Sequence, residues 1–222
     1  MRALVLGCDR DHSGPTTLGW CVSSYTNPTQ RFYGPLYVGG LLFNNDRKLR
    51  VYGLGQVGVV NHARDFGGLF RVGAFNAARR FAGVDLAAVS YVARSVAGAQ
   101  LAAVAMANEV TGAQVALVAF NDDRLHGLQV GAMAMSEDVA GLQLGAVTYV
   151  SQWIAGAQIG AVNIAGSNEG VQVGVVNVAR KQQGLQLGVI NVADSLEGVQ
   201  IGALNLSMRG GLPVMLLLNA GW

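Results

Sequence analysis

The chain has 222 residues, of which 51% are hydrophobic, 7% are aromatic and 13% are charged. Its 15 basic and 13 acidic residues give a formal net charge of +2, and they occur singly or in short groups. This distribution excludes the basic face expected of a nucleic-acid-binding protein and also an acidic tail. Polar residues interrupt every apolar stretch, so we expect no transmembrane helix.

Residues 1–50 have an irregular composition that includes most of the prolines and the aromatic cluster RFYGPLY. We expect them to form an N-terminal cap. The opening MRALVLGCDRD contains an apolar run too short for the core of a secretory signal peptide. Cys8 and Cys21 are the only cysteines. They could form a disulfide in an oxidising compartment, and two free thiols are an equal alternative.

Residues 53–58 read GLGQVG, which matches the G-x-G-x-x-G string of dinucleotide-binding loops. Such a loop opens a helix at its third glycine and is followed by an acidic residue about 20 positions on. Here Gln56 and Gly58 recur at the same positions of a tandem repeat. We therefore interpret the string as a repeat element, and we expect no nucleotide cofactor.

The repeat consists of eleven units of 14 or 15 residues over residues 54–211, for example GVQVGVVNVARKQQ and GLQLGVINVADSLE. With the unit glycine as position 0, apolar residues lie at positions 1, 3, 6 and 8, Gln at 2, Gly or Ala at 4, and Asn at 7. Period-2 patterning on both sides of positions 4 and 5 predicts two short strands joined by a bend. Phe66 and Trp153 lie in the turns, where we expect them to fill the core. A further apolar residue is often found near position 12, as at Val96, Val110, Leu125, Val139, Ile154 and Leu196.

Identical residues in consecutive units favour parallel stacking, because each Gln then meets a Gln and each Asn an Asn, and stacked amides form hydrogen-bonded ladders. The sequence therefore predicts an all-β fold, a parallel β-solenoid of 14–15-residue units. We expect Leu187 and Ile190 to point inward, with Gln186 and Asn191 as ladder residues. The predicted organisation is a cap over 1–50, the array over 54–211 and a cap over 212–222.

A second periodicity leaves an alternative open. Tyr91, Phe120 and Tyr149 are spaced by two units, which could mean two units per structural rung or a series of up-and-down hairpins. Hairpins would give an antiparallel β-barrel or meander, and the terminal Trp222 resembles the aromatic end of an outer-membrane barrel. In this alternative the protein is a membrane-embedded pore or anchor.

Candidate chemical groups are few. The histidines are His12, His62 and His126. His126 follows Asp122 and Asp123, which could form a metal or acid–base cluster, although a solvated turn is the favoured interpretation. His62, near Asp65, is interpreted as a tolerated substitution in the repeat. We predict no catalytic, cofactor-binding or metal-binding residues, and we predict that the protein is not an enzyme.

The C-terminal segment LPVMLLLNAGW follows the last unit. Pro213 removes a backbone donor, and we expect Leu216, Leu217, Leu218 and Trp222 to cover the end of the array with apolar side chains. Residues 212–222 are therefore predicted to cap the solenoid and to prevent end-to-end association.

The segments VYGLGQVGVVN, GLQLGVINVADSLEGVQIGALNLS and GLPVMLLLNAGW resemble a bacterial surface-repeat family named after leptospiral proteins, whose function is uncharacterised. The resemblance covers about residues 32–222 and implies an exported protein at the cell surface or secreted. We expect a non-enzymatic structural or binding scaffold for an unknown protein or surface partner. It could associate end to end or as a homo-oligomer, and contact with a membrane is expected only in the barrel alternative.

Overall fold

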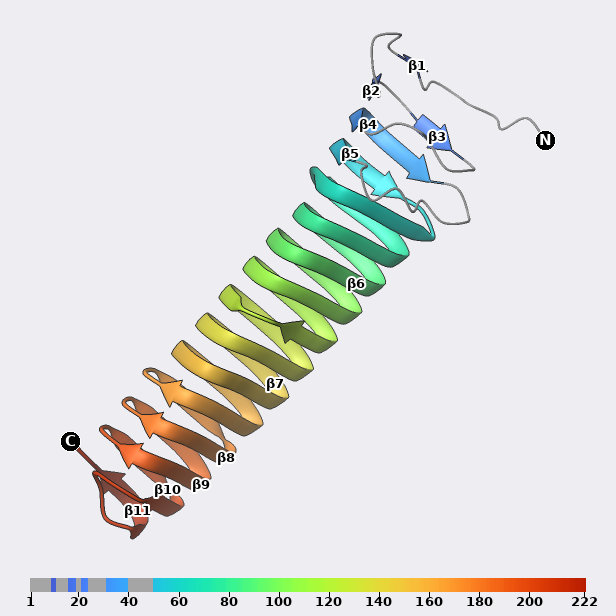
Figure 1. The fold of residues 1–222 in the computed structure, drawn as a ribbon. Coiled ribbons are helices and arrows are strands. Elements are labelled where there is room, and N and C mark those ends of the chain that lie inside the picture. Colours follow the sequence, from blue (N-terminus) through green and yellow to red (C-terminus); the bar gives the residue numbers. More distant parts are fainter. Residues whose placement is uncertain (1–8, 11–15, 19–20, 24–30, 40–49) are drawn as a thin grey trace. The chain divides into compact units, whose positions relative to one another are not determined.

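The computed structural model describes residues 9–10, 16–18, 21–23, 31–39 and 50–222. The chain divides into two compact units, Met1–Ala116 and Leu117–Trp222. The strands are β1 (Asp9–Arg10), β2 (Thr16–Leu18), β3 (Cys21–Ser23), β4 (Arg31–Gly39), β5 (Arg50–Val57), β6 (Val60–Asn121), β7 (Arg124–Asn168), β8 (Val171–Gln182), β9 (Leu185–Leu196), β10 (Val199–Ser207) and β11 (Val214–Ala220). Figure 1 shows β6 and β7 as continuous ribbons that wind through several turns.

In the second unit, successive turns pair in parallel and in register. Gln172 pairs with Gln186, and Gln186 pairs with Gln200, so one repeat unit makes one turn. The prediction of a parallel β-solenoid is confirmed, with about 11 turns in all. The antiparallel barrel or meander is wrong, because identical residues stack in parallel where hairpins would oppose different positions.

The first unit follows the same rule from β4 onward. Gly34 of β4 pairs with Gly53 of β5, and Gln56 of β5 pairs with Arg71 of β6, all in parallel. Parallel pairing thus includes part of the predicted N-terminal cap. The boundaries of the caps stay a prediction. Cys8 lies outside the described residues, as does the side chain of Cys21.

The side chains that point between the two strands of a turn are mostly polar, which reverses the predicted faces. Gln186 and Asn191 are fully buried, whereas Leu187 and Ile190 are partly exposed. The prediction that the two aliphatic side chains point inward is therefore wrong. Alternate side chains of a strand point to opposite faces, so turning the Gln and Asn side chains inward places positions 1, 3, 6 and 8 outside.

Glycine columns keep consecutive turns close together. Gly98 has φ +132°, a conformation that L side chains rarely adopt, and a Cβ there would overlap the carbonyl oxygen of Gly83. At position 4, a Cβ on Gly188 would collide with the Nδ2 atom of Asn177. In the units that carry Asn at position 7, the second glycine therefore makes room for the Asn side chain of a neighbouring turn, which explains the G-x-Q-x-G-x-x-N spelling.

An apolar core forms where each repeat unit connects to the next, near position 12, as predicted. Phe66 is buried and stacks on Phe81 with ring centroids 5.1 Å apart. Trp153 is only partly buried, because the neighbouring Ile154 occupies the interior position instead. The other predicted members of this column are all buried: Val96, Val110, Leu125, Val139 and Leu196.

The C-terminal strand β11 ends the second unit by antiparallel pairing with β10. The predicted apolar cover is wrong, since Leu216, Leu217 and Leu218 are exposed and Trp222 is 97% exposed. The buried residue of this strand is Asn219. The last turn is therefore followed by a strand that pairs through its backbone and buries the Asn219 amide. Apolar side chains do not form the cover.

Candidate functional site

A ladder of glutamines fills the interior of the second unit. The Nε2 of Gln172 donates to the Oε1 of Gln158 at 2.7 Å, and the Nε2 of Gln186 donates to Gln172 at 2.7 Å. Each also donates to a backbone carbonyl of its own turn, as from Gln186 to Val192 at 3.4 Å. Because both N–H groups of each amide are used, these ladder glutamines are satisfied without solvent.

A second ladder of asparagines lies on the other strand of each turn, and its donors point the opposite way along the chain. The Nδ2 of Asn163 donates to Asn177, which donates to Asn191, which donates to Asn205, each at 2.8 Å. The ladder glutamines from Gln143 to Gln200 each donate to the preceding turn, whereas the ladder asparagines Asn163, Asn177 and Asn191 each donate to the following one.

In the first unit an ion pair replaces two glutamines of the ladder. Arg71 donates to both carboxylate oxygens of Asp85, at 3.1 and 2.6 Å, and both side chains are fully buried. Asn76 and Ser90 also donate to Asp85, each at 2.5 Å. The Arg71 guanidinium lies 4.7 Å from the ring centroid of Phe81. The two opposite charges are buried away from solvent and pair with each other, which indicates a structural role.

The side chains that suggested chemistry do not form a site. Asp122 and His126 are exposed at the break between β6 and β7, with Asp123 partly exposed between them. His62 lies on the outside of β6, partly exposed, and His12 is outside the described residues. Among the residues that the structure describes, no group of three His, Cys, Asp or Glu could hold a metal ion.

The GLGQVG string begins inside β5 and opens no helix, unlike a dinucleotide-binding loop. A Cβ on Gly53 would overlap the carbonyl oxygen of Gly34, and one on Gly55 would overlap the Phe70 ring. The carbonyl oxygen of Gly58 accepts a hydrogen bond from Asn61 at 3.3 Å. The close approaches at Gly53 and Gly55 explain these two glycines as packing positions. The absence of nucleotide binding stays a prediction.

The candidate site is the outer surface. Both strands of each turn present aliphatic side chains outward, and the bend between them carries only glycine and small or aliphatic residues. Exposed members in the first unit include Leu69, Val72, Val84, Leu86, Leu101 and Val115. Those in the second unit include Leu117, Met133, Val147, Ile159, Val175, Val189 and Ile201. We call this surface of each unit the apolar wedge.

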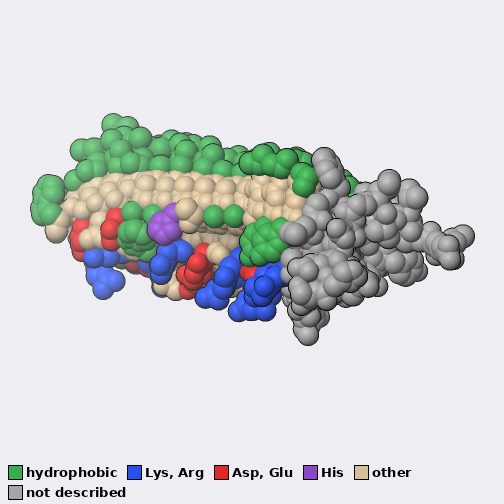
Figure 2. Space-filling model, turned by 90° about the horizontal axis from the view of Figure 1, so that it is seen from above, with side chains coloured by type: hydrophobic (Ala, Val, Ile, Leu, Met, Phe, Trp, Pro, Cys, Tyr) green, Lys and Arg blue, Asp and Glu red, His purple; other side chains and the backbone are tan. Residues whose placement is uncertain are grey.

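In the repeat units over residues 54–211, all charged side chains except the buried Arg71 and Asp85 lie in the connections between units, at the edge opposite the bend. Between positions 10 and 14 lie Arg64, Asp65, Arg79, Arg80, Arg94, Glu109, Asp122, Asp123, Arg124, Glu137, Asp138, Glu169, Arg180, Lys181, Asp194, Glu197 and Arg209. Figure 2 shows hydrophobic side chains gathered along one edge and charged side chains along the other. Each turn is therefore amphipathic in cross-section. We call the second edge the charged edge.

Aromatic side chains mark the boundary between these two surfaces. Tyr91, Phe120 and Tyr149 occupy position 8, the last outward position before the charged turn, and are 42%, 37% and 38% exposed. Tyrosine combines an apolar ring with a polar hydroxyl, so it suits a level where hydrocarbon and water meet.

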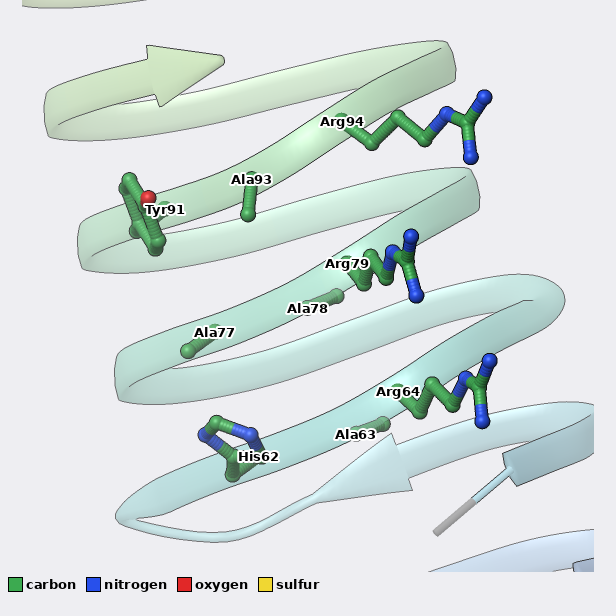
Figure 3. A pocket seen from close by; sticks show the side chains of 9 residues that line it. All are labelled: His62, Ala63, Arg64, Ala77, Ala78, Arg79, Tyr91, Ala93 and Arg94. Carbon is green, nitrogen blue, oxygen red and sulfur yellow. The ribbon is translucent and has the colours of Figure 1, made fainter. Parts of the chain in front are cut away.

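A shallow groove follows the same boundary in each unit, above small residues at position 9. In the first unit it has a volume of about 520 Å³, with Ala63 and Ala78 in its floor and Arg64, Arg79 and Arg94 along one side. Figure 3 shows the three arginine side chains on consecutive turns, pointing the same way. The corresponding groove of the second unit has about 330 Å³ and contains both Arg180 and Asp194.

No known protein family, curated protein or solved structure matches this chain. Among the described residues, no helix is long and apolar enough to cross a membrane.

Sequence reasoning missed the apolar wedge because it assigned the aliphatic positions to the interior. A usable signal was present, since charges are absent from positions 1, 3, 5, 6 and 8 of the units over residues 98–206 and are concentrated in the turns. The arginine row was also detectable as Arg64, Arg79 and Arg94 at equal spacing.

Proposed function

We propose that this chain is a non-enzymatic structural and binding scaffold that docks on a lipid bilayer with its apolar wedge in one leaflet. The observation that carries this proposal is the inverted distribution of side chains, with amides inside and aliphatic residues outside. Val175 and Val189, at the bend, are 53% and 51% exposed. Large contiguous apolar surfaces on a protein mark sites of interaction with membranes or other proteins.

The dimensions of the wedge suit one leaflet. From the bend at position 5 to the aromatic residues at position 8, a strand covers about 10 Å at about 3.3 Å per residue. One leaflet contributes about 15 Å to a hydrocarbon core about 30 Å thick. With the bend deepest, Tyr91 and Tyr149 would lie near the headgroups and the charged edge would lie in water.

The hydrogen bonding of the turns is compatible with hydrocarbon. In lipid every backbone polar group needs a partner within the protein. Here the turns bond to one another, as in the parallel pairing of β8 with β9, and the interior amides bond to one another in ladders. Inserting the wedge therefore leaves few backbone groups without a partner.

A bilayer covers this surface more completely than a second copy of the chain would. Both outer faces and the bend are apolar, whereas a face-to-face dimer buries one face of each copy and leaves the others in water. The hydrocarbon of a leaflet would surround both outer faces and the bend. We also propose that this scaffold lies at the cell surface, the location expected from the predicted resemblance of its repeats to a bacterial surface-repeat family.

The test is flotation of the purified full chain with vesicles of phosphatidylcholine, which carry no net charge. The double variant Val175→Glu/Val189→Glu places two carboxylates at the bend, where they would have to enter hydrocarbon. We expect vesicle binding to weaken by on the order of 10,000-fold, because each of the two charges costs about 3 kcal/mol near the bilayer centre and every 1.4 kcal/mol is a factor of about ten.

The matched control is Ser195→Glu, in the same turn as Val189 but on the charged edge, beside Lys181 in register. We expect it to bind vesicles like the unchanged protein. Flotation of the double glutamate variant to the same extent as the unchanged protein would contradict the proposal. A dimer in detergent-free buffer that does not bind vesicles, and that the double variant dissociates, would show that a second copy covers the wedge.

A further inference from the structure

The groove of the first unit carries a row of positive charge. Arg64, Arg79 and Arg94 lie on consecutive turns, and neighbouring turns of a sheet are about 4.8 Å apart. Arg79 and Arg94 are exposed, and Arg64 is partly exposed. Alanines form the floor between them, so the guanidinium groups border an open space and are not covered by other side chains.

Like charges stacked across neighbouring strands are unfavourable. Within the described part of the chain, none of these three arginines makes an ion pair. The nearest acidic residue in sequence, Asp65, bonds instead to Arg50 at 3.2 Å. The row therefore has a charge that a bound anion would compensate.

On the charged edge of the second unit, basic side chains do have partners within the protein. Lys181 lies 3.4 Å from Glu197 of the following turn, and Gln183 donates to the same carboxylate at 2.8 Å. Arg180 shares its groove with Asp194 and donates to the backbone carbonyl of Ser151 at 3.1 Å. Cross-turn pairing is thus available to this fold, and the arginine row of the first unit does not use it.

We propose that the groove of Arg64, Arg79 and Arg94 binds the phosphate group of an anionic lipid headgroup. Guanidinium groups match phosphate oxygens with paired hydrogen bonds. A volume of about 520 Å³ falls in the range of small-ligand sites. The groove also borders Tyr91 at the rim of the apolar wedge, so a headgroup there leaves its acyl chains beside the aliphatic face. The choice of a lipid as the source of the phosphate rests on the proposed docking to a bilayer.

The test compares vesicles of phosphatidylcholine alone with vesicles that also contain phosphatidylglycerol, at low salt. The unchanged full chain is expected to prefer the anionic vesicles by on the order of 100-fold, since each of the three arginines near an anionic surface contributes about fivefold. The triple variant Arg64→Gln/Arg79→Gln/Arg94→Gln should lose most of this preference and bind pure phosphatidylcholine as before.

Two controls separate the groove from general charge and from misfolding. Arg180→Gln removes a positive charge from the groove of the second unit and should leave the preference almost unchanged. The triple lysine variant Arg64→Lys/Arg79→Lys/Arg94→Lys should retain part of the preference, because it keeps the charge without the paired donors. A triple glutamine variant that prefers anionic vesicles as strongly as the unchanged protein would overturn the inference, although the wedge could still dock.

Calorimetry with soluble ligands tests the arginine groove even if the protein binds no vesicles. Short-chain phosphatidylglycerol, below its micelle concentration, should bind saturably to the unchanged protein and not to the triple glutamine variant. Lack of binding would overturn the inference independently of bilayer docking. Equal affinity for inorganic phosphate would show that the groove recognises free phosphate and would overturn its assignment to a lipid headgroup.

Discussion

Gln172 illustrates how single amides hold this fold together. Its Nε2 donates to Gln158, its Oε1 accepts from Gln186, and its second N–H reaches the carbonyl of Val178 at 3.4 Å. Each such bond contributes about 1 kcal/mol net, whereas a buried polar group left without a partner costs about 1 to 3 kcal/mol. Removing any one glutamine of the ladder therefore lowers the stability of the fold.

The variant Gln172→Leu should lower the free energy of unfolding by about 2 to 6 kcal/mol. The substitution leaves an acceptor on Gln158 and a donor on Gln186 buried without partners. Urea denaturation in a fixed detergent measures the change. Val175→Thr, on the exposed bend of the same turn, is the control and should shift stability by less than about 0.5 kcal/mol. Equal effects of the two substitutions would contradict the polar interior.

The faces of the strands could not be predicted from residue type alone. The sequence identifies Gln186 and Leu187 as lying on opposite faces, because they are adjacent in a strand. The usual preference for buried leucine then places Leu187 inside. What overrides this preference is the ladder, since stacked glutamines satisfy one another completely, and the glycine columns keep the turns close.

At the scale of elements, the column near position 12 is apolar except where Asn168 and Gln182 interrupt it between Ile154 and Leu196. Asn168 donates to the Oε1 of Gln182 at 2.9 Å, but the Nε2 of Gln182 is buried without a partner. Burial of the Gln182 Nε2 group therefore costs free energy that no hydrogen bond offsets, whereas the ladder amides form hydrogen bonds with one another.

Replacing both residues, as Asn168→Ile/Gln182→Leu, should raise the free energy of unfolding by about 1 to 2 kcal/mol. The pair would then match the apolar members above and below it, and removing both partners of a buried hydrogen bond is close to neutral or stabilising. We expect this gain to exceed the loss of the part-buried hydrogen bond from the backbone N–H of Gly170 to the Oδ1 of Asn168. Gln182→Leu alone should gain less, because it leaves the Nδ2 of Asn168 unpaired. A double variant less stable than the unchanged protein would show that the amide pair contributes more than its geometry suggests.

The strand β11 closes the glutamine ladder through Asn219. The Nδ2 of Asn219 donates to the Oε1 of Gln200 at 3.3 Å and to the carbonyl of Leu212 at 2.9 Å, while its Oδ1 accepts from the backbone N–H of Leu212 at 3.1 Å. No repeat pattern marks this residue, because it lies outside the repeated units, so its role could not be read from the sequence.

The variant Asn219→Leu should release β11 while the preceding turns stay folded. It removes the donor to Gln200 and both bonds to Leu212, so amide hydrogens of β11 should exchange faster by about one to two orders of magnitude. Hydrogen exchange followed by mass spectrometry measures this, with Leu218→Ala on the exposed face as the control. Unchanged protection of β11 in the Asn219 variant would show that backbone pairing alone holds the strand.

At the scale of the whole molecule, parallel stacking was predictable because identical residues recur at a fixed interval and only parallel register brings them together. The number of units per turn was not, since the spacing of Tyr91, Phe120 and Tyr149 fits either one or two. The structure decides for one unit per turn. The charged edge was visible in the sequence, whereas the apolar wedge depended on the orientation of the strands.

Deleting residues 209–222 should turn the full chain into one that associates end to end. The deletion removes β11 and exposes the edge of β10, together with the free acceptor of Gln200, to the matching edge of another chain. Light scattering of the truncated and full-length proteins, at equal concentration in the same detergent, tests this. A truncated protein of unchanged size would show that residues 209–222 do not act as a cap.

The opposite donor directions of the two ladders have an electrical consequence. Side-chain dipoles along the glutamines point one way and those along the asparagines point the other, as in Gln186 to Gln172 and Asn177 to Asn191. Adding a turn therefore adds two opposed dipoles of similar size, unlike a helix, whose aligned peptides sum to a macrodipole. Duplication or loss of a repeat during evolution would then leave the polarity of the array almost unchanged, so the number of turns is free to vary without an electrostatic limit.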